Sequence, residues 1–318
     1  MTLKTLFISL VLSWTILMPS TSVAQRSIGD VKKEPKVATD DIADVPVKLW
    51  LGKKFIFLEK PKSSQKYGFD LHLVKNFYAH RSSYDSDLET DVTYNLRYDK
   101  FVGRIMTVVD IEDKPFDSII TFQGDETKRN IYGKPYKGRI DGIALIDDME
   151  KAKTRWLGKT VYAKLKAIIT YSAEFDKFGD VKVQVAEPLK VSDLWWGFYS
   201  IDPLWLIVET SKGERGFISF AYSWTNIYRD WWKDYRPWED KFFEENPKVK
   251  FKWTDDVWNL ISSGKVKLEM TKEQVQLSWG RPKKVNEDIY QGSVREQWVY
   301  DSQYLYFEND QLTAMQNR

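Results

Sequence analysis

The sequence predicts a β-rich α+β protein of several domains. Three observations favour this class. Short runs of β-branched and aromatic residues recur between Gly, Asp and Pro. A four-residue motif occurs twice, and the last part of the chain combines helix-capping signals with alternating aromatic segments. We therefore expect two related small modules of β-barrel or β-sandwich type at 39–146 and 147–250, followed by a smaller domain at 251–318.

The first residues are typical of a secretory signal peptide. Lys4 precedes an apolar run at 6–12, and small residues end the segment at Ala24. The run is too short, and Pro19 follows it too closely, for a spanning helix, although an uncleaved membrane anchor is the alternative. We expect cleavage near Ala24 and a periplasmic or secreted protein. Residues 25–38 are charged and poor in large apolar groups, which predicts a flexible leader.

The composition excludes several classes of function. The chain contains no cysteine, so it has no disulfide, no cysteine nucleophile, no thiolate metal site and no cysteine-linked lipid anchor. The 48 Lys and Arg residues are mixed along the chain with 46 Asp and Glu residues, and no basic stripe of the kind that nucleic acid requires is present. We therefore expect neither a nucleic-acid partner nor a lipid anchor.

An internal repeat organises the first two modules. The motif Trp-Leu-Gly-Lys occurs at 50–53 and at 156–159, each time after a pair of aspartates, and a degenerate third copy spans 254–265. Each copy predicts a short helix with Asp as its N-terminal cap and Gly at its end. The alternative is that so short a repeat arises by chance. The predicted strands of this region lie at 55–58, 104–111, 118–122, 161–165, 181–185, 204–208 and 216–220.

The C-terminal segment has the clearest local signals. Thr271 and Gln274 form a capping box, and the helix that they begin ends at Gly280. An earlier helix has Thr254 as its cap and ends at Gly264. In each case apolar residues flank the cap in the positions of a hydrophobic staple: Met270 and Val275, and Trp253 and Trp258. Alternating segments at 285–290, 294–300, 304–308 and 311–316 then predict an antiparallel meander.

This segment resembles the SmpA/OmlA (BamE-like) domain. The resemblance is carried by Gly264-Lys265-Val266, by the Met-Thr-Lys-Glu-Gln-Val sequence from Met270, by Trp-Gly-Arg-Pro from Trp279, by Glu-Gln-Trp-Val-Tyr from Glu296 and by Tyr-Leu-Tyr-Phe from Tyr304. It implies two helices on a small sheet, in an envelope protein that binds other proteins. Glu269 departs from the family's usual Gly, and the family's anchor cysteine is missing. The resemblance implies no catalytic role.

Nine of the 14 tryptophans lie between Trp195 and Trp258. The aromatic spacing from Tyr228 to Phe242 predicts a helix with one aromatic face, kinked at Pro237. Such a face is either a buried stripe or an exposed shelf that contacts a partner. The candidate binding residues are Trp231, Trp232, Tyr235 and Trp238.

No catalytic, cofactor or metal site is predicted. His72 and His80 lack the spacing of a helical metal pair, and the alternating acids at 85–91 lack the Gly and the final acid of an EF-hand. No nucleophile or phosphate-binding motif is present. We expect a non-enzymatic envelope protein that binds a protein partner or assists assembly. The alternative is a protein that binds, or binds and hydrolyses, glycan or peptidoglycan through its tryptophan-rich region.

Overall fold

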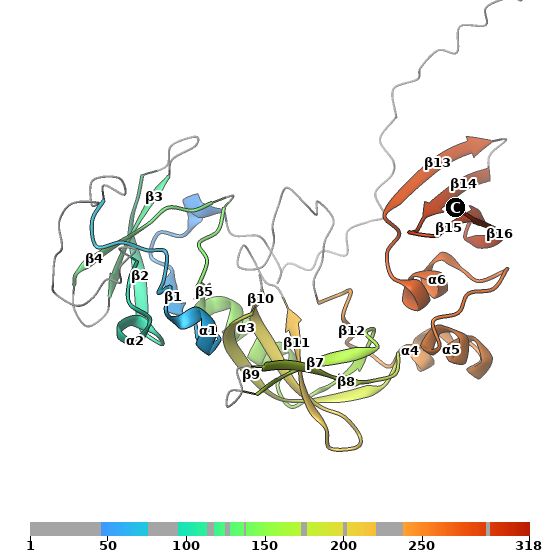
Figure 1. Ribbon diagram of the computed structural model, residues 1–318, viewed down its shortest axis with the longest axis horizontal. Helices are drawn as coiled ribbons and strands as arrows, with labels where there is room; N and C mark the ends of the chain where they lie inside the picture. Colours follow the sequence, from blue (N-terminus) through green and yellow to red (C-terminus); the bar gives the residue numbers. More distant parts are fainter. Residues whose placement is uncertain are drawn as a thin grey trace, which may run out of the picture. The chain divides into compact units, whose positions relative to one another are not determined.

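The computed structural model describes residues 46–75, 95–112, 118–124, 128–136, 138–172, 177–199, 202–220, 238–290 and 293–318 (Figure 1). The predicted β-rich class is confirmed, since strands predominate and the helices are short. The strands of these ranges form three sheets, and none of the three closes on itself. Within the same ranges, no helix has both the length and the apolar character needed to cross a membrane.

The first sheet has the strand order β4-β3-β2-β1-β5 with antiparallel neighbours. Alternation along β1 sends Phe55 and Phe57 into the core, where both are almost fully buried with Trp50 and Phe122. The elements of this part are η1 (Val47–Leu49), β1 (Lys54–Phe57), α1 (Lys62–Gln65), α2 (Tyr98–Phe101), β2 (Ile105–Glu112), β3 (Ile119–Gly124), β4 (Asn130–Gly133) and β5 (Ile143–Leu145).

The second sheet has the order β12-β6-β9-β10-β11-β7-β8. Helix α3 (Ile146–Trp156) precedes it and places Trp156 in the core, in edge contact with Phe220 and Phe242. The strands are β6 (Thr160–Ala163), β7 (Ala167–Ser172), β8 (Lys177–Lys182), β9 (Pro188–Tyr199), β10 (Asp202–Glu209), β11 (Arg215–Phe220) and β12 (Phe242–Phe243).

The two copies of the Trp-Leu-Gly-Lys motif adopt the same local structure. Gly52 and Gly158 both have φ +76°, a left-handed conformation that favours glycine. The Gly52 N–H donates to the Val108 carbonyl (2.9 Å), and the Val108 N–H donates to the Lys53 carbonyl (2.9 Å). In the second copy the Gly158 N–H donates to the Val191 carbonyl (3.0 Å), and the Val191 N–H donates to the Lys159 carbonyl (2.9 Å). Each motif therefore closes a turn and begins pairing with a distant strand.

The strand neighbours also correspond. In the first sheet β1 lies between β5 and β2, and β3 and β4 follow; in the second, β6 lies between β12 and β9, and β10 and β11 follow. A β-bulge follows the motif-bonded valine in both sheets, at Val109 in β2 and at Ser192 in β9. The second sheet differs by the β7–β8 hairpin, which comes between β6 and β9 in sequence and pairs with β11.

The C-terminal part contains α4 (Pro247–Phe251), α5 (Asp255–Ser262), α6 (Lys272–Trp279), β13 (Lys284–Tyr290), β14 (Ser293–Val299), β15 (Gln303–Glu308) and β16 (Gln311–Asn317). The four strands form an antiparallel meander, as the alternation predicted. Trp258 and Val275 from α5 and α6 share a core with Trp298 and Phe307 from the sheet. The helices therefore cover one face of this sheet, while its other face is turned away from that core.

The residues that carry the family resemblance bond to one another. Trp279 Nε1 donates to the Gly264 carbonyl (2.9 Å), and Ser278 Oγ donates to the carbonyl of Lys265 (2.8 Å). The Tyr300 hydroxyl donates to the Gly280 carbonyl (2.9 Å), and burial raises the pKa of this tyrosine above its ordinary value. These bonds join α5, α6 and the end of β14, which explains the motif residues as structural ones.

Four local predictions differ from the structure. Thr254 stands at the start of α5 as expected, but its side chain makes no capping hydrogen bond. Helix α3 begins after Leu145 and has no side-chain cap, so Asp147 and Asp148 lie in its first turn and do not cap it. The strand predicted at 181–185 ends at Lys182. The helix predicted up to Phe242 does not include its last residues, because 238–241 form a turn and Phe242 pairs with Ala163 in the sheet. Long-range strand pairing outweighs helical spacing at that position.

Candidate functional site

One of the four candidate binding residues is described, and it is buried. Trp238 is 6% exposed and packs against Trp156 and Phe242, each at a ring-centroid distance of 5.5 Å. The Arg155 guanidinium lies over its ring at 4.7 Å. Trp238 thus belongs to the core of the second sheet and offers a ligand little surface. Trp231, Trp232 and Tyr235 lie outside the described residues.

Charged groups hold this aromatic cluster at its edge. Glu244, which follows β12, accepts hydrogen bonds from Arg155 Nε and Nη2 (2.6 and 2.7 Å) and from Trp156 Nε1 (2.6 Å). Burial favours the protonated carboxyl, but these hydrogen bonds and the charges of Arg155 and Lys159 outweigh it, so the pKa of Glu244 lies below its ordinary value. The arrangement connects α3 to β12 and is structural.

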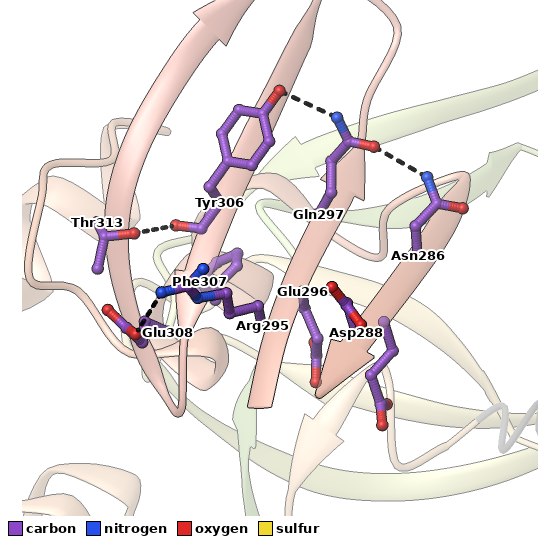
Figure 2. A pocket seen from close by; sticks show the side chains of 10 residues that line it. Asn286, Asp288, Arg295, Glu296, Gln297, Tyr306, Phe307, Glu308 and Thr313 are labelled. Atoms are coloured by element: carbon purple, nitrogen blue, oxygen red, sulfur yellow. Dashed lines mark hydrogen bonds and ion pairs between the residues drawn. The ribbon is translucent and has the colours of Figure 1, made fainter. Parts of the chain in front are cut away.

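A row of polar side chains crosses the face of the C-terminal sheet that is turned away from the helices. Asn286 Nδ2 donates to Gln297 Oε1 (2.9 Å), Gln297 Nε2 donates to the Tyr306 hydroxyl (3.0 Å), and that hydroxyl donates to Gln316 Oε1 (2.7 Å). Figure 2 shows the first three residues side by side across three strands. We call these four residues the polar row.

Strand pairing places the polar row on one face. Asn286 is opposite Gln297, and Gln297 is opposite Tyr306. Side chains alternate along each strand, so these residues point away from the core side that Trp298 and Leu305 occupy. Gln297 and Tyr306 are half-buried, whereas the outer residues are exposed. The row is therefore held in place by its neighbours and remains accessible to a partner.

An open hollow of about 520 Å³ adjoins the polar row (Figure 2). Arg295 reaches Glu308 at 3.3 Å, and Thr313 Oγ1 donates to the Tyr306 carbonyl (3.1 Å). We call it the acidic hollow, because four carboxylates and one guanidinium line it. Its lining residues are Asn286, Glu287, Asp288, Arg295, Glu296, Gln297, Tyr306, Phe307, Glu308 and Thr313.

The other residues considered from the sequence form no such site. His72 pairs with the backbone of Tyr132 and lies 3.4 Å from Asp70, whose pKa is lowered mainly by the hydrogen bond with His72. His80 and the acids at 85–91 lie outside the described residues. Among the residues that the structure describes, no group of three or more His, Cys, Asp or Glu side chains is arranged to hold a metal ion.

Sequence reasoning found the four strands of this sheet but not the polar row. The row depends on which residues of neighbouring strands lie opposite one another. The sequence Gln291-Gly292 was a usable signal, because it predicts a tight turn. Tyr290 does pair with Ser293, and this register places Asn286 beside Gln297. Comparison of the chain with protein-family models, with curated proteins and with solved structures found no match. The functional argument therefore depends on the chain's own residues.

Proposed function

We propose that this chain is an exported, non-enzymatic binding protein that contacts a protein partner through the open face of its C-terminal sheet. The observation that carries the proposal is the polar row, which spans all four strands of that face. The signal-peptide pattern supports export to the periplasm or beyond, and the resemblance to the SmpA/OmlA (BamE-like) domain supports a role in binding or assembly.

The chemistry of the row suits a polypeptide. Each side chain of the row donates to the next one, from Asn286 toward Gln316. Among the residues that the structure describes, the Asn286 side-chain carbonyl and the Gln316 side-chain N–H groups therefore have no hydrogen-bond partner. These are the groups that pair with peptide N–H and C=O groups. Gln297 and Tyr306 are already held by the hydrogen bonds of the row, so little of their side-chain entropy is lost when a partner binds. Tyrosine is also enriched at protein interfaces.

The rest of the chain supports this surface as a scaffold. The matching turns, bulges and strand neighbours of the first two sheets support two related β-modules of about the predicted extents, 39–146 and 147–250, arisen by duplication. We also propose that the two modules are of small β-barrel or β-sandwich type, and that 251–318 is a BamE-like domain.

The test is capture of a partner by the purified full chain from an envelope fraction of the source cells. We expect wild type to retain a protein that Gln297→Ala and Tyr306→Phe lose, because each variant breaks the polar row. The matched control is Gln123→Ala, which removes a cross-strand amide contact to Asn130 (3.3 Å) in the first sheet. Equal capture by all four proteins, or no captured protein at all, would contradict the proposal.

A glycan partner is tested in the same samples, since amides and tyrosines also bind sugars. Glycan or peptidoglycan fragments are titrated while tryptophan fluorescence is recorded. Saturable binding that Gln297→Ala abolishes and Gln123→Ala preserves would replace the protein partner with a glycan.

A further inference from the structure

The outer strand β13 differs from the opposite edge of the C-terminal sheet. It pairs with β14 through seven consecutive residue pairs without a register shift. The opposite edge strand, β16, shifts register beside Tyr306 and Phe307. In the described part of the chain, no strand pairs with the outer side of β13. A long regular edge presents unpaired N–H and C=O groups that can accept another strand, whereas a bulged edge is protected.

The side chains of β13 are exposed in a pattern that an added strand would cover. Val285 and Ile289 point to the helix side of the sheet and are 46% and 68% exposed. Asn286 and Asp288 point to the other side and line the acidic hollow. Polar or charged residues alone would suffice to keep an edge soluble. Two exposed apolar side chains on one side of the strand favour a partner.

The charge at this edge is negative once ion pairs are considered. Arg295 pairs with Glu308, and Lys272 Nζ pairs with Glu296 Oε1 at 2.6 Å. Glu287 and Asp288 form no ion pair within the described ranges, because Arg295, which lies opposite Asp288 in β14, reaches Glu308, and Lys272 reaches Glu296. Lys284 lies four residues from Asp288 along the strand, about 13 Å away. A segment opposite Glu287 and Asp288 would therefore gain from basic residues.

A second copy of the chain fits this edge poorly. Two copies of β13 can pair antiparallel, with the helices on the same side, about Asn286 or about Glu287. Pairing about Asn286 places Lys284 opposite Asp288 of the other copy, which matches their charges, but it places Val285 opposite Glu287 and Ile289 opposite Lys283, so neither apolar residue finds an apolar neighbour. Pairing about Glu287 matches Val285 with Ile289 but places two Glu287 carboxylates opposite each other, which is unfavourable.

We infer that β13 receives an extended segment of a partner protein as a fifth strand, with basic residues opposite Glu287 and Asp288 and apolar residues opposite Val285 and Ile289. This inference deepens the proposed function and depends on it, because it specifies the chemistry of the protein partner. Backbone hydrogen bonds supply affinity in this mode, and the alternate side chains supply specificity.

The probe is a labelled peptide, Ser-Ile-Lys-Lys-Thr-Val-Ser, titrated with the full chain and followed by fluorescence anisotropy. When the peptide lies antiparallel to β13, its Ile is opposite Ile289 and its Val is opposite Val285. Its two Lys residues are then opposite Asp288 and Glu287. We expect saturable binding, weaker binding of the peptide with Glu in place of both Lys, and loss of binding when alternate backbone nitrogens are methylated. No binding of the lysine peptide, or binding that methylation leaves intact, would overturn the inference.

The matched variants are Asp288→Lys and Asp180→Lys. Both replace an exposed aspartate on an edge strand, the second in β8 of another sheet. Asp288→Lys should weaken binding of the lysine peptide about three- to tenfold and strengthen binding of the glutamate peptide. Asp180→Lys should change the binding of neither peptide. Equal effects of the two variants on peptide binding, or a wild-type dimer that Asp288→Lys dissociates, would refute the inference. Partner capture that depends on Gln297 but not on Asp288 would leave the proposed function standing and remove only this inference.

Discussion

At the scale of single residues, Glu244 shows how a charge stabilises an aromatic core. Its carboxylate accepts two bonds from Arg155 and one from Trp156, whose indole is otherwise almost fully buried. The Glu244 side chain is 33% exposed. Solvent therefore screens part of the attraction to Arg155, and the contribution of the pair is moderate.

Replacing Glu244 should reduce both stability and its dependence on pH. A glutamine side chain at this position would still accept from the indole but would lose the ionic attraction, so we expect Glu244→Gln to lower the free energy of unfolding by about 1 to 2 kcal/mol at pH 7. The folded-state pKa is lowered, so the ionised form stabilises the protein above the ordinary glutamate pKa, and this is lost as pH falls through the lowered value.

Urea unfolding, followed by tryptophan fluorescence at pH 7 and near pH 3, measures this effect. Wild type should lose more stability between the two pH values than Glu244→Gln does. The control is Glu245→Gln, at the exposed neighbouring position. A variant that remains less stable than wild type by the same amount at both pH values would contradict the assignment.

At the scale of elements, α6 is specified by its own first residues. Gln274 N donates to Thr271 Oγ1 (3.3 Å), and Thr271 N donates to Gln274 Oε1 (3.0 Å), which confirms the predicted capping box. Met270 and Val275 on either side of the cap are buried in the same core, and Trp253 and Trp258 contact each other at 5.0 Å around the start of α5. Both hydrophobic staples are therefore present.

Loss of this cap should destabilise the C-terminal part measurably. We expect Thr271→Ala to lower the free energy of unfolding by about 1 kcal/mol, since the N–H of Gln274 loses its acceptor. Thr271→Ser keeps the hydroxyl and should lie close to wild type. Chemical unfolding of the three proteins, monitored by circular dichroism, provides the comparison. Equal stability of the Ala and Ser variants would mean that the hydroxyl contributes nothing.

At the scale of the whole molecule, the two glycine turns test whether the first two sheets are built alike. Gly52 and Gly158 share the same φ, and a Cβ at either position would meet no atom within 4 Å. Steric crowding is therefore excluded at both sites, and only the cost of the left-handed backbone remains.

Equivalent substitutions should then have equal effects. We expect Gly52→Ala and Gly158→Ala each to lower the free energy of unfolding by about 1 to 2 kcal/mol. Asn tolerates the left-handed region better, so Gly52→Asn and Gly158→Asn should cost less than the alanines. Thermal and urea unfolding of the four variants measure the differences. A neutral effect at one site and a large one at the other would show that the motif has different roles in the two sheets.

Much of the C-terminal domain was predictable because its signals are local. A capping box, a glycine at a helix end and an alternation of apolar residues each depend on side chains a few positions apart, so α5, α6 and the four strands were expected nearly in place. Strands β4, β5, β7 and β9 had weaker local signals and were not predicted. The polar row was out of reach for another reason, since its members come from four strands.

The sequence by itself determined the β-rich class, the capping box of α6 and the position of the repeated glycine turns, because these depend on contacts between near neighbours in the chain. Only the tertiary structure decided that Trp238 is buried, that Phe242 joins a strand beside Ala163 and that Asn286, Gln297, Tyr306 and Gln316 form one row. Those outcomes depend on strand register and on packing between residues far apart in sequence, where many pairings satisfy the same local pattern and the whole core selects among them.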